Sequence, residues 1–260
     1  MINLENARKE FLEYTKQYDN QVPAIQRKIE HSLRTMDVMK DLAENLKLSE
    51  ENVKLASLIG LLHDIGRFEQ WKRFETYVDL VSIDHGDMGV YILQKNNYIR
   101  KFIETDKYDN IIFESIKNHN KYIMDEELEN DEEFFAQMIK DADKLDIFYQ
   151  ITEKFHGNIE EIENSYISES YMNQLENNTL IYREEKQTPL DQYALITSFI
   201  FDLYFNFSIQ TVRRENYINR FFRKINFKNK KTKEQVKRLL YIAETYLWET
   251  KLNEAKLINN

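Results

Sequence analysis

Five histidines are the residues of this 260-residue chain best suited to chemistry: His31, His63, His85, His119 and His156. His63 is followed directly by Asp64 at the end of an apolar stretch, where a carboxylate is costly unless it is paired or bound to a cation. His31 and Asp143 also lie within apolar helical patterns, and two further acids flank Asp143. Histidine nitrogens and carboxylate oxygens on separate helices suit divalent ions of Mn, Fe, Co, Ni, Zn or Mg. This donor set indicates a metal site.

These residues do not all indicate metal binding equally strongly. A His-Asp pair taken alone is more often an ordinary helix-capping arrangement than a pair of metal ligands, so the prediction depends on the combination of all four positions. His156 stands between Phe155 and Gly157, beyond this pattern. We expect it to be an ordinary surface histidine.

The combined pattern resembles the HD-domain metal-dependent phosphohydrolases, which have a His, then a His-Asp pair, then a distal Asp. Here His31, His63, Asp64 and Asp143 meet it, and the resemblance covers roughly residues 20 to 155. It implies one or two divalent ions that activate water to cleave a phosphoester. The implied substrate is a small phosphorylated metabolite, and we expect a nucleotide.

Two further histidines decide the branch of this family. Dinuclear members supply extra histidines between the His-Asp pair and the distal Asp, and His85 and His119 look like that arrangement. The neighbours of His119 are Asn118 and Asn120, where dinuclear members commonly show adjacent histidines. The alternative is that His85 and His119 contact ligands or substrate around a single metal. With two metals, Asp64 would be the bridging carboxylate.

Cations beside these positions are candidates for binding the phosphate. Together with Asp64 we predict Arg67, Lys121 and Lys144 as catalytic residues, because a phosphoryl group needs positive charge at its non-bridging oxygens. For Lys144 an ion pair with Asp141 or another acid is the competing interpretation.

Carboxylates near the ligand positions are expected to orient the histidines through their second ring nitrogens. The candidates are Glu69, Asp84 and Asp146. Asp146 follows Asp143 by three residues and therefore shares a helix face with it.

Two other functions stay open. The first is an oxygen-dependent di-iron lyase or oxygenase, a minority chemistry of the same superfamily, which requires His85 and His119 as iron ligands. The second is a regulatory protein without catalysis, in which a basic segment docks a partner. That segment runs from Arg213 to Arg238 with eleven Lys/Arg against two Glu. It is either a solvated surface or a docking site for an acidic partner or a polyanionic ligand.

The elements that must position these residues are helices. Glycine and proline together make 5 + 2 = 7 of 260 residues, well below the usual share of about 12%, which disfavours loop-rich β folds. Apolar periodicity predicts helices over residues 2–18, 23–46, 53–63, 84–95, 103–118, 131–154 and 189–207. A further helix is expected to follow residue 207 and end near 222, and the last one covers 232–257. Gly66 interrupts the pattern just after the third of these helices, so His63 and Asp64 are expected at a helix end, with a connecting stretch over 68–83. We predict an all-α protein, with an HD-domain helical bundle in residues 1–155 and a C-terminal helical extension in 156–260.

Composition excludes several classes of protein. The chain has no cysteine, so disulfides, thiolate metal sites and a cysteine nucleophile are ruled out. Its formal charge of −9 argues against general binding to nucleic acid or an anionic membrane, and no long apolar stretch indicates a membrane span. We expect a cytoplasmic bacterial protein whose partner is its small phosphorylated substrate. The aromatic segment 199–207 leaves a homodimer open.

Overall fold

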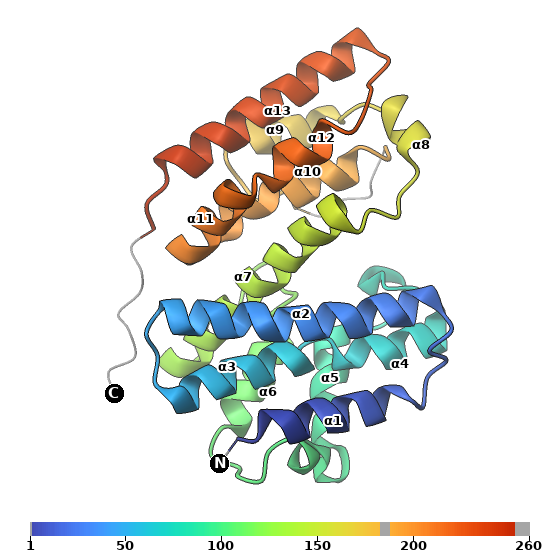
Figure 1. The fold of residues 1–260 in the computed structure, drawn as a ribbon. Helices are drawn as coiled ribbons and strands as arrows, with labels where there is room; N and C mark the ends of the chain where they lie inside the picture. The colour runs from blue at the N-terminus through green and yellow to red at the C-terminus, as the bar shows by residue number, and fades with distance from the viewer. Residues whose placement is uncertain (1, 183–187, 253–260) are drawn as a thin grey trace. The chain divides into compact units, whose positions relative to one another are not determined.

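The computed structural model describes residues 2–182 and 188–252, and every regular element within them is a helix (Figure 1). The predicted all-α class is confirmed. Contacts divide the described chain into two compact units, one ending at Asp143 and the other beginning at Lys144. No helix among these residues is long and apolar enough to cross a membrane.

The first unit is a bundle of helices with short connections. Its elements are α1 (Leu4–Thr15), α2 (Pro23–Asn45), α3 (Glu50–Leu62), α4 (Ile65–Phe74), the 3₁₀ turn η1 (Asp79–Val81), α5 (His85–Gln94), the 3₁₀ segment η2 (Lys95–Lys101), α6 (Asp109–Asn118) and the beginning of α7 (Asn130–Glu153). Helices α2 and α3 make the most extensive contact, and α4 packs on α5, which packs on α6. This order brings the ends of α3, α5 and α6 together.

Helix α3 is the centre of this bundle. Ser49 caps it by accepting a hydrogen bond from the backbone N–H of Asn52. Two acidic residues in its first turn interact favourably with the positive end of the helix dipole. Every residue from Leu55 to Leu62 is buried, so the helix is covered on all sides. The residues that follow it, His63 and Asp64, are therefore held inside the unit.

The predicted helix end at His63 and Asp64 is confirmed, since α3 ends at Leu62, but the connecting stretch predicted from residue 68 begins only after Phe74. Helix α4 starts directly after Asp64 and continues to Phe74, so Gly66 lies in its first turn. A Cβ atom at Gly66 would stand 2.1 Å from the carbonyl oxygen of His85 and 2.7 Å from the nitrogen of Gly89. The glycine is needed because α4 and α5 pack backbone against backbone there. Only the stretch after Phe74 connects the two helices.

The second unit contains the remainder of α7 and a group of shorter helices. These are α8 (Ile159–Glu163), α9 (Glu169–Glu176), α10 (Asp191–Ser198), the 3₁₀ turn η3 (Phe199–Asp202), α11 (Asn206–Glu215), α12 (Tyr217–Phe222) and α13 (Lys230–Glu249). Helix α13 packs on α9, α10, α11 and α12. The single helix predicted over 189–207 is divided, because α10 ends at Ser198. The last helix ends at Glu249 rather than near Leu257, and residues 253–260 lie outside the described residues.

Candidate metal centre

One group of ligand-type side chains forms where α2, α3 and α7 meet. His31 is on α2, His63 caps the C-terminus of α3, and Asp143 is on α7. The Nε2 atom of His31 lies 3.1 Å from Nε2 of His63 and 3.0 Å from Oδ1 of Asp143. It also lies 3.3 Å from Oδ2 of Asp64, the residue that precedes α4. The four residues that the sequence pattern predicted as ligands therefore converge.

A second group lies on the other side of Asp64. His85 is the first residue of α5 and His119 caps the C-terminus of α6, and their Nε2 atoms are 2.9 Å apart. Oδ1 of Asp64 lies 3.4 Å from Nε2 of His85 and 3.7 Å from Nε2 of His119. The two carboxylate oxygens of Asp64 thus face two different pairs of histidines. Each pair, taken with Asp64, offers three ligand atoms within 4.8 Å of one another.

The histidines of both groups are buried, and burial keeps His63 and His85 neutral. All four rings are at most 5% exposed. Burial lowers the pKa of His63 to about 3 and that of His85 to about 4. Neutral imidazole is the form that binds metals.

The Nδ1 protons of three of these rings point away from the centre. Nδ1 of His63 donates to the carbonyl of Gly60 at 2.8 Å, and Nδ1 of His119 donates to the carbonyl of Ile116 at 2.6 Å. Nδ1 of His85 lies 2.7 Å from a carboxylate oxygen of Asp79 and donates to it. A neutral ring that donates at Nδ1 has a bare lone pair at Nε2. In the neutral form that binds metals, His85 and His119 would present bare Nε2 atoms 2.9 Å apart, an arrangement that a shared cation stabilises.

A comparison with protein-family models identifies the domain that contains these residues. A family model described as "HD domain" matches residues 29–148, which include all six residues of the two groups. Residues 29–148 therefore form an HD domain. Members of the HD-domain superfamily are mostly metal-dependent phosphohydrolases, and the four buried histidines of this domain form with Asp64 a donor set that can hold metal. Neither the curated proteins nor the solved structures include a match to the chain.

On α2, a lysine that the sequence prediction missed contacts the shared carboxylate. Nζ of Lys28 lies 2.6 Å from Oδ2 of Asp64. Burial alone would raise the pKa of Asp64, but the Lys28 ammonium and the nearby histidines hold it well below its usual range. Lys28 precedes His31 by three residues on α2, so the shared helix face is the signal that could have identified it.

The three predicted phosphate-binding cations have different surroundings. Arg67 is at the centre, with Nε 3.4 Å from Oδ1 of Asp64. The ammonium of Lys121 binds both carboxylate oxygens of Asp125, at 2.8 and 2.7 Å.

The third of these cations belongs to the second unit. Lys144 donates to a carboxylate oxygen of Asp202 at 2.6 Å and to the carbonyl of the same residue at 2.6 Å. The competing interpretation for Lys144, an ion pair with an acid, therefore describes its contact, although the acid is Asp202 rather than Asp141. Of the three, Arg67 is the one whose cationic group the structure brings to Asp64.

The carboxylate that orients a histidine is Asp79, which sequence reasoning missed. It accepts from Nδ1 of His85 with one oxygen, and the other oxygen accepts from Arg67 and Gln70 at 2.8 and 2.7 Å. Burial alone would raise the pKa of Asp79, but the His85 ring and Arg67 hold it below its usual value. Asp79 lies in η1, between exposed apolar residues, and no periodicity marks that stretch.

The acids predicted for this orienting role have other contacts. Glu69 pairs with Arg73 at 2.6 Å. Asp84 caps α5 through the backbone of Asp87 and accepts from Asn120. Asp146 belongs to the second unit and accepts a hydrogen bond from the side chain of Gln150. His156 is exposed, as expected.

Proposed function

We propose that the HD domain binds two divalent cations and hydrolyses a phosphoester of a small phosphorylated metabolite, with a nucleotide as the expected substrate. His31, His63, Asp64 and Asp143 would hold one ion, and Asp64, His85 and His119 the other. The observation that carries the proposal is the position of Asp64, whose two oxygens face two pairs of histidines. A carboxylate placed in this way suits a bridge between two ions.

The donor set fits the metals expected from the sequence. Four neutral imidazoles with two carboxylates suit Mn, Fe, Co, Ni or Zn, whereas Mg prefers a shell of oxygen atoms. When bound, such a cation supplies Lewis acidity, since it lowers the pKa of water and neutralises charge on a phosphoryl oxygen.

The chain itself supplies groups for binding the phosphate. The Lys28 side chain is 21% exposed, and its ammonium can move from Asp64 to a substrate oxygen, because lysine is a flexible point charge. Arg67 is fixed instead, since one of its terminal nitrogens donates to Gln70, Tyr77 and Asp79. Within the described chain, its buried Nε has no hydrogen-bond acceptor. We propose Lys28 and Arg67 as the cations that contact the phosphoryl group.

The test is phosphate and nucleoside release from a broad panel of nucleotides by metal-loaded protein, with Asp64→Asn as the inactive control. Release by the native protein and none by the variant is expected. No release of either product from any nucleotide would contradict the proposal. Oxygen consumption by iron-loaded protein without phosphate release would favour the di-iron oxygenase alternative.

A further inference from the structure

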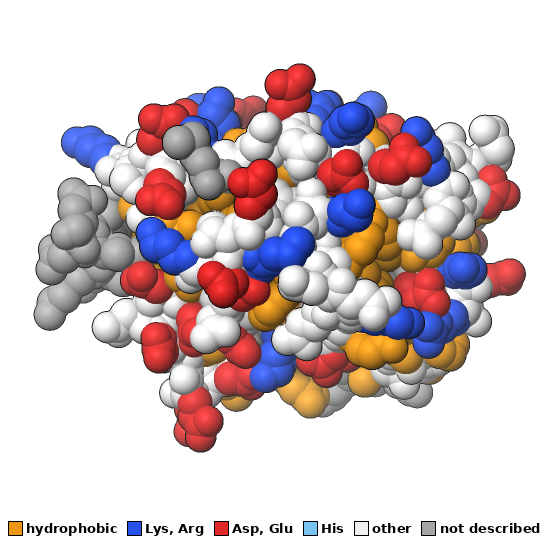
Figure 2. Space-filling view, turned by 90° about the horizontal axis from the view of Figure 1, so that it is seen from below, with side chains coloured by type: hydrophobic (Ala, Val, Ile, Leu, Met, Phe, Trp, Pro, Cys, Tyr) orange, Lys and Arg blue, Asp and Glu red, His pale blue; other side chains and the backbone are white. Residues whose placement is uncertain are grey.

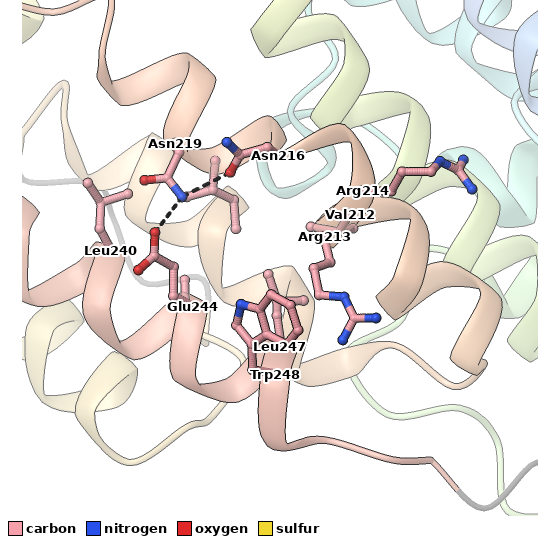
Figure 3. Close-up of a pocket in the computed structure, with 11 residues that line it drawn as sticks. Val212, Arg213, Arg214, Asn216, Asn219, Leu240, Glu244, Leu247 and Trp248 are labelled. Atoms are coloured by element: carbon pink, nitrogen blue, oxygen red, sulfur yellow. Dashed lines mark hydrogen bonds between the residues drawn. The ribbon is translucent and has the colours of Figure 1, made fainter.

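A pocket of about 360 Å³ lies within the second unit, between α11, α12 and α13 (Figure 3). Its apolar lining includes the buried side chains of Val212, Ile218 and Leu247. Its volume is within the range of about 300 to 1,000 Å³ that small-molecule pockets occupy. All the lining residues belong to one unit, so the pocket is formed without the HD domain centre.

One side of the pocket pairs an exposed indole with a guanidinium group. Trp248 is 68% exposed, an unusual state for the largest apolar side chain. The guanidinium carbon of Arg213 lies 4.5 Å from the centroid of its ring. Figure 3 shows Arg213 reaching from α11 toward Trp248 on α13, while Arg214 points away. The indole presents a flat surface, and the guanidinium presents several donors beside it.

The opposite side of the pocket carries amide and carboxylate groups held in place by hydrogen bonds. Nδ2 of Asn219 donates to Oε1 of Glu244 at 2.8 Å and to Oδ1 of Asn216 at 3.0 Å (Figure 3). A carboxylate has about four acceptor positions, so Glu244 can accept further hydrogen bonds from a ligand. This wall can therefore contact the polar edge of a flat ring.

The pocket lies at the beginning of the basic segment 213–238, whose role the HD domain does not explain. Several cations of this segment are paired within the second unit: Arg220 with Glu153, Lys228 with Glu163, and Arg238 with Glu176. Arg213 makes no ion pair with any described residue. Arg213 is therefore the cation that this side of the pocket offers to an anionic ligand.

We propose that this pocket is a second ligand site, which binds a purine nucleotide. The base stacks on Trp248, its polar edge meets Glu244, and the phosphates bind Arg213. A nucleotide joins a flat heteroaromatic ring to a polyanion, so each part of the site has a matching part in the ligand. The inference goes beyond the hydrolysis proposed for the HD domain and does not depend on it.

The experiment is calorimetric titration of the full chain with ATP and, separately, GTP in the presence of EDTA. The chelator removes metal-dependent binding at the HD centre. Saturable binding of at least one nucleotide is expected, and Trp248→Ala should weaken it by about tenfold or more, since stacking on an aromatic ring contributes that much. Arg213→Met should weaken it as well. Trp248→Phe should retain more of the affinity than Trp248→Ala, which separates stacking from a loss of folding.

Tyr241→Ala is the matched control. Tyr241 is exposed on the same helix and has its own cation, Arg238, 5.7 Å from its ring, but it does not line the pocket. Its substitution should leave the affinity unchanged, and Asp64→Asn should do the same. Absence of binding to both nucleotides, native affinity in Trp248→Ala, or an equal loss in Tyr241→Ala or Asp64→Asn would each overturn the proposal.

Discussion

The two groups of ligand-type residues around Asp64 are built differently. The first is placed by the long helices α2 and α7 and the buried α3, and it contains a second carboxylate, Asp143. The second comes from the ends of the ten-residue helices α5 and α6, and within the described chain Asp64 is its carboxylate. His85 depends on Asp79 in the connecting stretch for its orientation. We infer that the first group binds its metal ion with the higher affinity. The affinity of the second group depends more on outer contacts such as Asp79.

The largest expected effect is that of Asp64→Asn, because both groups share this side chain. An amide cannot supply two anionic oxygens, so we expect loss of both metals and a fall of phosphate release to background. Elemental analysis together with the nucleotide panel measures both. A variant that keeps one metal and substantial activity would show that the two groups do not depend on a common carboxylate.

A smaller effect, confined to the second group, is expected for Asp79→Asn. The change removes the anion that fixes the His85 proton on Nδ1. We expect the affinity of the second ion to fall about 10- to 100-fold, as such outer partners typically contribute, while the first ion is retained. Competition with a metal-binding dye measures the two affinities separately. Asp84→Asn is the control, since Asp84 caps α5 and is bound by Asn120. Equal weakening of both ions by Asp79→Asn would refute the comparison.

Lys28→Met should reduce phosphate release without removing metal. The substitution takes away a charge-assisted contact to the substrate, so a loss of about tenfold or more in kcat/KM is expected. Lys121→Met is the matched control, because its ammonium is bound to Asp125. If Lys121→Met lowered kcat/KM more than Lys28→Met, the assignment of the phosphate-binding cation would be reversed.

The pH dependence of stability follows from the depressed histidine pKa values. In chelated protein, the unfolded chain takes up protons at His63 and His85 near pH 6.5, whereas the folded chain does so only near pH 3 and 4. The unfolding free energy should therefore decrease as the pH falls below about 6.5. Thermal unfolding of chelated protein between pH 7.5 and 5 measures this slope. His63→Gln should reduce it and His156→Gln should not; a flat profile for the native protein would contradict the prediction.

Sequence reasoning predicted most of the helices, and it selected candidate ligand residues that the structure brings together, because both follow a pattern. Apolar periodicity marks α2, α3 and α7, and costly polar residues inside those patterns, such as His31 and Asp143, stand out. Asp79 was missed because it lies in an irregular stretch, where no periodicity indicates which way a side chain points. Adjacency to a ligand in the sequence also misleads. Lys144 follows Asp143 directly, but consecutive helix residues face different directions, and its ammonium binds Asp202.

The central claim is that Asp64 joins two metal-binding groups. The most direct test is elemental analysis of protein purified without added metal or chelator, comparing the native chain with His85→Ala and His119→Ala. We predict two ions per chain in the native protein and one in each variant, with His156→Ala unchanged as the control. One ion per chain in the native protein, unaffected by either substitution, would contradict the account and place His85 and His119 in substrate binding.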